Sequence, residues 1–299
     1  MKLKLAGYTG FIIVCLCFSF FRHFPATDAA DYMEHRLSRL SGSLNVRIND
    51  IRPALPLGLS SDGIRFEWAR MNKVDLSDPR IYLKPLSLFT DTVHMPYEFR
   101  VFEGSVSGSA AVAKDNPGQL NVDSVLKNIH LNNVRLGNRF GGCRLTGLVR
   151  GNISTELSQF RPRYLEGHMT VENGRMEFIE PFFTLEQLPF SVIELNVKMV
   201  SKNKMVLEKS SLKGNMIDAD IMGDISLSPR FSQWRPNLTV KLKFHPEFFV
   251  RHKNEAMKNL IVSSASERHI LTVSVKGTME NPRIRSEEHT SELQSLSHI

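Results

Sequence analysis

The chain has 299 residues, 41% of them hydrophobic, with a formal net charge of +7. This length allows one large β domain or two smaller ones, each with a core. Three cysteines cannot build a disulfide framework, and two of them, Cys15 and Cys17, lie inside an apolar N-terminal run. Packing and hydrogen bonding must therefore hold the fold together.

The apolar run covers residues 5–21, which carry no charge and follow Lys2 and Lys4. It is at the short end for a membrane-spanning helix and long for the core of a signal peptide. Phe20 and Phe21 suit a signal cleavage site poorly, and the lysines favour a cytoplasmic N-terminus. We expect residues 1–24 to be an uncleaved single-pass anchor, with an exported body; a cleaved signal and a buried core helix are the alternatives.

Residues 25–42 show helical spacing, because Ala30, Met33 and Leu37 recur every three or four residues. Thr27 or Asp28 suits the N-cap and Gly42 the stop. We expect a juxtamembrane helix that either lies on the bilayer or caps a sheet.

Beyond Gly42 the hydrophobic period changes to two. Ile193 and Leu195 share one face of a predicted strand, and Glu194 and Asn196 share the other. The alternation recurs in 237–244 and 271–276, and weaker runs lie at 43–50, 63–68, 78–84, 97–113, 119–136, 145–157, 166–179 and 204–228. We predict a mainly β fold over 43–285, an elongated, twisted antiparallel β-sheet or β-groove with one or two capping helices.

A glycine followed two residues later by Val, Ile or Met recurs along this body. Glycine serves where a strand starts, bends or bulges with φ > 0, or where another backbone comes close. The pattern occurs at Gly104, Gly151, Gly167, Gly174, Gly223 and Gly277. These repeats indicate meandering strands rather than the surroundings of a catalytic pocket.

The last stretches of the chain differ from the strands. Residues 246–261 have apolar positions on one helical face, so we expect a helix that covers an end or open side of the sheet. Residues 286–299 resemble the translation of a sequencing-library adapter, and we expect a non-native tail there. Because this tail holds three glutamates and no Lys or Arg, the net charge without it rises from +7 to +10.

The sequence holds no pattern typical of an active site. It lacks a phosphate-binding glycine loop, a His-Glu-x-x-His motif and a Cys-x-x-Cys pair. We read His168 as an ordinary strand residue, Asp218 and Asp220 as part of a solvated polar face, and Cys143 as a small residue at a turn or strand start. The interpretation is therefore a non-enzymatic protein without a catalytic site, cofactor or metal. We read its basic residues as scattered and solvating; as a binding surface they would suit anionic lipid or acidic partners better than nucleic acid.

The order of these features is similar to the type II secretion system protein GspN in its long, single-anchor form. The most specific match is PALPLGL at residues 53–59, with Pro53, Leu55, Pro56 and Gly58 as family motif positions. The resemblance covers about residues 1–285 and implies an accessory or assembly component of the bacterial inner membrane. Its main domain would face the periplasm, its partners would be other secretion subunits, and it implies no catalytic residues.

The repeated strands also resemble AsmA- and TamB-like envelope proteins. That resemblance implies a β-groove whose apolar faces bind or transfer phospholipid. The two readings share one apolar face per strand, so periodicity does not separate a closed core from an open, lipid-facing groove. We take the secretion component as the first hypothesis and the lipid-binding groove as the alternative.

Overall fold

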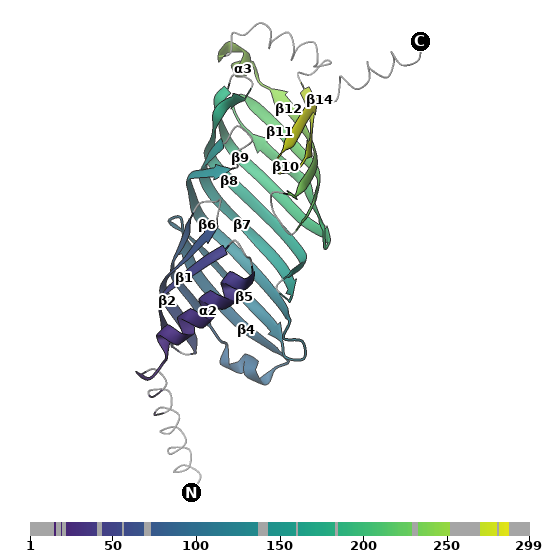
Figure 1. The fold of residues 1–299 in the computed structure, drawn as a ribbon. Coiled ribbons are helices and arrows are strands. Elements are labelled where there is room, and N and C mark those ends of the chain that lie inside the picture. The colour runs from purple at the N-terminus through teal and green to yellow at the C-terminus, as the bar shows by residue number, and fades with distance from the viewer. Residues whose placement is uncertain are drawn as a thin grey trace. The chain divides into compact units, whose positions relative to one another are not determined.

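The computed structural model is mainly β (Figure 1). It describes residues 15, 19, 22–40, 44–55, 57–68, 73–136, 143–159, 161–182, 185–228, 233–251, 270–279 and 281–286. The predicted antiparallel β architecture is confirmed, because the strand pairs run antiparallel and neighbours in the sheets are neighbours in the chain. The chain divides into two compact units.

Unit 1 comprises Met1–Val101 and Val106–Pro117. Its β1, β2, β3 and β4 pair in that order. Its elements are α2 (Ala26–Leu40), β1 (Leu44–Ala54), β2 (Gly58–Trp68), β3 (Val74–Tyr82), the 3₁₀ helix η1 (Pro85–Phe89), β4 (Thr92–Val101) and most of β5 (Gly104–Ala113). The helix expected over residues 25–42 is thus present as α2.

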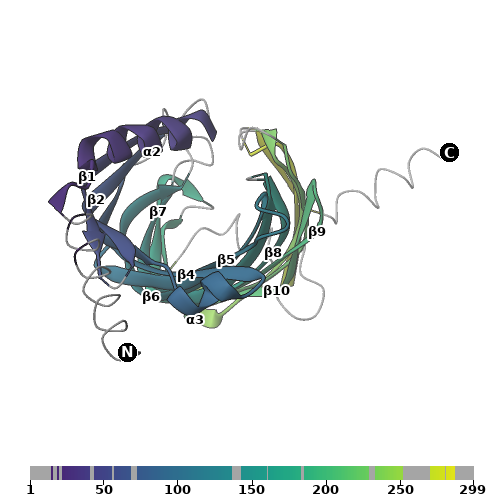
Figure 2. The ribbon, with the colours of Figure 1, turned by 90° about the horizontal axis from the view of Figure 1, so that it is seen from below.

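Helix α2 lies along β1 and β2 rather than capping a sheet end (Figure 2). Its apolar stripe, which includes Met33 and Leu37, packs on a buried cluster of Val46, Ile48 and Ile51. Glu34 accepts a hydrogen bond of 2.6 Å from the backbone N–H of Ile48, which fixes the helix along the strand. The apolar face of this hairpin is therefore closed by the helix that precedes it.

Unit 2 comprises Phe102–Ser105 and Gly118–Ile299. From β6 to β14 each strand pairs antiparallel with the next one in the chain. Its elements are β6 (Gln119–Leu136), β7 (Cys143–Ser158), β8 (Arg161–Phe182), β9 (Leu185–Ser201), β10 (Lys204–Lys213), β11 (Ile217–Ser226), β12 (Arg235–Phe244), α3 (Pro246–Arg251), β13 (Ile270–Gly277) and β14 (Pro282–Ser286).

Several strands contain one residue in the left-handed region, which interrupts the alternation of their faces. Asn128 in β6, Asn173 in β8 and Lys209 in β10 have φ of 51°, 49° and 46°. The register of β6 shifts between Leu126 and Ile129, on either side of Asn128. Each such bulge moves the following apolar residues back to the face they would otherwise leave.

The expected ends of the chain lie largely outside the described residues. No helix in the described part of the chain has both the length and the hydropathy for a membrane span. Most of the predicted anchor over 1–24, and the predicted tail beyond Ser286, are not described. The helix expected over 246–261 is seen as α3 up to Arg251.

Candidate functional site

The strands of unit 2 share an apolar face. The register pairs apolar residues across the sheet, for example Met169 with Leu195 and Leu242 with Leu271. Similar pairs join every neighbouring strand from β6 to β13: Leu120↔Leu157, Val149↔Val171, Val171↔Ile193, Met205↔Met199, Leu212↔Ala219, Ile221↔Val240 and Val240↔Val273. The face is therefore unbroken across these strands.

The middle of this apolar face is only partly buried. Leu195, Val197, Leu207, Ile221 and Val240 all keep some exposed surface. Their backbone N–H and C=O groups belong to the strand ladders, so what faces outward here is hydrocarbon. A surface of this kind is a candidate for contact with another apolar body.

One end of the same face is covered by α3. Phe248 is 1% exposed, and its ring centroid lies 4.8 Å from that of Phe244 at the end of β12. Phe249 packs edge-on against Phe248 at 5.4 Å. Among the residues that the structure describes in unit 2, α3 is the one helix, and it closes an end of the face rather than its middle.

The repeat glycines of β7, β8, β11 and β13 lie along this face, and Gly174 shows why one of them is needed. A Cβ at Gly174 would lie 2.2 Å from the Thr146 carbonyl oxygen and 2.3 Å from Cζ of Phe190. The Phe190 ring, which is 4% exposed, therefore occupies the space that a side chain would take. Here a glycine permits an aromatic ring to lie against the neighbouring strand.

The other repeat glycines fill different roles. A Cβ would meet backbone closer than 3.0 Å at Gly104, Gly151, Gly223 and Gly277, and the last two have φ of 139° and 102°. Gly104 begins β5, whereas Gly151 and Gly223 lie inside β7 and β11. At Gly167 the nearest atoms would be 3.7 Å away, so this position does not require glycine.

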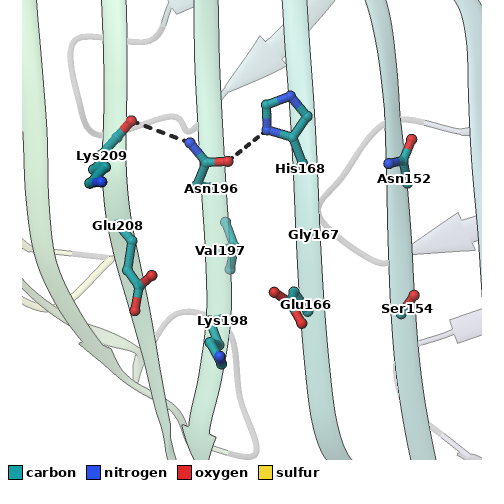
Figure 3. A pocket seen from close by; sticks show the side chains of 10 residues that line it. All are labelled: Asn152, Ser154, Glu166, Gly167, His168, Asn196, Val197, Lys198, Glu208 and Lys209. Carbon is teal, nitrogen blue, oxygen red and sulfur yellow. Dashed lines mark hydrogen bonds between the residues drawn. The ribbon is translucent and has the colours of Figure 1, made fainter.

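The opposite face of β7 to β10 carries a polar depression of about 510 Å³ (Figure 3). Its side chains come from neighbouring strands in register, with Asn152 beside His168 and His168 beside Asn196. The lining residues are Asn152, Ser154, Glu166, Gly167, His168, Asn196, Val197, Lys198, Glu208 and Lys209. Within this depression His168 lies beside polar side chains of the two neighbouring strands.

The hydrogen bonds of the depression serve the bulge between β9 and β10. His168 Nδ1 lies 2.6 Å from Asn196 Oδ1, and Asn196 Nδ2 donates to the Lys209 carbonyl at 3.3 Å (Figure 3). The backbone N–H of Asn196 donates to Ser210 Oγ at 3.1 Å, and Ser210 is 1% exposed. These contacts satisfy backbone groups that the bulge takes out of the ladder, so the cluster has a structural explanation.

Asp218 and Asp220 share the polar face of β11 but have different neighbours. Asp218 accepts a hydrogen bond of 3.2 Å from the Gly214 backbone and lies 3.4 Å from Lys213 Nζ. Burial alone would raise the pKa of Asp218; the Gly214 hydrogen bond, His245 and Lys213 outweigh it, so the pKa is lowered from 3.8. Asp220 is exposed opposite Lys241. The two carboxylates therefore do not form a joint acid–base pair.

His245 is the unusual neighbour of Asp218. Its Nε2 is buried and makes no hydrogen bond of good geometry, but lies 3.3 Å from Asp218 Oδ1. This contact becomes an ion pair when the imidazole is protonated. No group of three or more His, Cys, Asp or Glu side chains in the described ranges could hold a metal ion.

The motif at residues 53–59 forms the turn between β1 and β2 in unit 1. Pro53 pairs with Leu59 and Ala54 with Gly58, whose added Cβ would meet the Ile81 carbonyl oxygen at 2.5 Å. Leu55 is 72% exposed, and Pro56 lies outside the described residues. The motif is thus a tight hairpin turn that presents apolar side chains.

Hydrophobic alternation alone does not predict the residues with positive φ, although the sequence contains a signal for some of them. Two polar residues, Lys127 and Asn128, separate the apolar Leu126 and Ile129, where simple alternation would have one. Asn and Asp tolerate φ > 0 better than most residues, and an Asn at such an interruption is a recognisable bulge signal. Lys209, in a similar interruption, carries no such signal.

Comparison with protein-family models, curated proteins and solved structures finds no match to this chain. The resemblances to GspN and to AsmA-like proteins therefore remain predictions.

Proposed function

We propose that this protein is a non-enzymatic, lipid-binding component of the bacterial envelope, and that the apolar face of unit 2 holds the hydrocarbon chains. One observation carries the proposal: the face is unbroken from β6 to β13, and its middle is partly exposed. Hydrocarbon chains need an apolar surface without unsatisfied polar groups, and a regular β ladder supplies one.

The energetics of such binding follow from apolar burial. Each methylene group that is removed from water contributes about 0.8 kcal/mol to the free energy of binding. An acyl chain that lies across several strands therefore binds more tightly than a group that makes one small contact. Residues such as Leu195 and Val240 would lose their remaining exposed surface to the same chain. No directional contact is needed, so we expect selection for acyl chains rather than for one headgroup.

The setting that we propose is the type II secretion system, with the body of the protein in the periplasm behind a single inner-membrane anchor. This part rests on the resemblance at residues 53–59 and on the charge-free run over 5–21. The two parts of the proposal are tested separately.

Lipid binding is tested on the purified full-length protein by mass spectrometry of the lipids that remain bound. Leu195→Lys places a charge on the apolar face, and Glu194→Lys places the same charge one residue away on the polar face. We expect phospholipid with the wild type and with Glu194→Lys, and a several-fold loss with Leu195→Lys. Equal lipid content in the two variants, or none in the wild type, would contradict the proposal.

The setting is tested by deleting the gene in a bacterium that has a type II system and measuring the secreted substrates. We expect reduced secretion, which the intact gene restores. Unchanged secretion of every substrate would contradict a role in type II secretion. The lipid-binding function would then still be tested by the mass spectrometry of bound lipids.

A further inference from the structure

One end of unit 1 presents large apolar side chains to solvent. Leu55 and Leu57 lie in the β1–β2 turn, and Leu86, Leu88 and Phe89 lie in η1. Leu86 and Phe89 are 82% and 89% exposed, more than the other large apolar side chains of the described residues. We refer to these five residues as the apolar rim.

The two parts of the rim are joined by the backbone. The N–H of Leu83, which follows β3, donates to the Leu57 carbonyl at 2.7 Å, and η1 begins two residues later. The 3₁₀ helix is itself fixed, because the buried Ser87 donates from Oγ to the Lys84 carbonyl and accepts from the His94 N–H at 3.1 Å. The outward apolar side chains therefore sit on an ordered support.

The rim lies at the end of unit 1 where the chain arrives from its N-terminal apolar run. Helix α2 and β1 are joined by a short connection and packed side by side, so they run in opposite directions. The start of α2, where Phe24 contacts the buried cluster, is thus at the end of β1 that leads into the β1–β2 turn. Figure 1 shows the start of α2 and the blue helix η1 at the same, lower end of this unit.

Two lysines lie beside the rim. Lys84 precedes η1 and is exposed, and Lys114 donates from Nζ to the Leu88 carbonyl at 2.6 Å. Asp91 and Asp115, also exposed, offset these two charges. Lysines with long apolar stems beside leucine and phenylalanine are typical of segments that lie at the headgroup level of a bilayer.

From these observations we infer that the apolar rim rests in the interfacial layer of a phospholipid bilayer, beside the point where residues 5–21 enter it. The occupant is the bilayer surface rather than a protein, because the apolar run leaves from this end and would hold the rim at the membrane. This inference rests on the proposed membrane anchor; it concerns unit 1 and does not depend on lipid binding along unit 2.

The test uses the full-length chain in vesicles of phosphatidylethanolamine and phosphatidylglycerol. Cys15, Cys17 and Cys143 are replaced by Ser, and a single cysteine with an environment-sensitive fluorophore is placed at Leu86 or Phe89. Lys73, exposed at the start of β3 and hence at the other end of the strands, is the matched control. Quenching by lipids that carry a nitroxide on the upper acyl chain reports contact with the bilayer.

We expect several-fold stronger quenching at positions 86 and 89 than at position 73. Equal quenching at the three positions overturns the inference, whether or not the N-terminal run inserts. A fluorophore that is shielded only in native membrane vesicles, without lipid quenching, assigns the rim to a protein partner and also overturns it. Loss of lipid from the Leu195→Lys variant would leave this result unchanged, so the two proposals fail separately.

Discussion

The two units complete the same kind of amphipathic hairpin in different ways. In unit 1 the apolar face of β1 and β2 is closed by α2, and Val46 is 2% exposed. In unit 2 the apolar face of β8 to β11 carries partly exposed residues such as Leu195 and Leu207. An alternating pattern thus specifies which face is apolar, but the element that covers the face is specified elsewhere in the chain.

The largest effect is expected where the face is closed. Val46→Asp places a carboxylate without a partner between α2 and β2, which costs about 3–5 kcal/mol of the free energy of unfolding. Thermal unfolding followed by circular dichroism, with limited proteolysis of α2, measures it. Asn45→Asp, at the exposed neighbouring position, is the control and should leave the melting temperature nearly unchanged. A mild effect of Val46→Asp would mean that α2 does not seal this face.

Packing within the sheet of unit 2 is tested at two glycines of the same strand. Gly174→Ala forces a methyl group against the Phe190 ring and the Thr146 carbonyl, and should cost about 1–3 kcal/mol. Gly167→Ala meets no atom closer than 3.7 Å and should cost almost nothing. Chemical denaturation of both variants measures the difference. Equal stabilities would show that Phe190 does not occupy the place of a side chain at Gly174.

A smaller effect is expected at Asp218, at the start of β11. The folded pKa of this carboxyl lies below 3.8, so it stabilises the fold above that pH and loses its contribution as the pH falls through the folded value. Asp218→Asn should lower the stability by about 1 kcal/mol at neutral pH, because the Gly214 N–H and Lys213 lose a charged partner. Denaturation midpoints from pH 7 to pH 2 measure it, and the two proteins should converge in acid. A constant difference across this range would mean that the carboxylate charge is not responsible.

The smallest effect on stability is expected where the face is open. Leu195→Lys in lipid-free protein should cost about 1 kcal/mol or less, because the amine can reach water from a partly exposed position. The same denaturation measurement as for Val46→Asp allows direct comparison. A loss as large as that of Val46→Asp would show that the middle of the unit 2 face is closed in solution.

The sequence predicts the β architecture well because each strand carries its own local signal. Alternation between Ile193 and Glu194 identifies both the strand and its apolar face, and the spacing of Met33 and Leu37 identifies α2 and its packing side. These patterns arise from backbone periods of 2 and 3.6, which act within a few residues. They predict element type before any long-range contact is known.

The remaining features depend on contacts between strands. The requirement for glycine at position 174 comes from a ring sixteen residues later in the chain, and Gly167 has the same local pattern without that ring. The positive φ of Lys209 is supported by Asn196 of the neighbouring strand, which no local pattern at Lys209 indicates. The apolar rim likewise depends on the backbone hydrogen bond between the Leu83 N–H and the Leu57 carbonyl.

The order of the strands also bears on how the protein is made. Within each unit every strand pairs with its immediate predecessor, and most of these pairings close only a short loop that costs little chain entropy. The pairing of β12 with β13 is the exception, because residues 245–269 separate the two strands. A chain that emerges N-terminus first can add one strand at a time to an existing edge, without waiting for residues still to be synthesised. The most recently added strand then has a temporarily unpaired edge, and each new strand that pairs with it presents the next such edge.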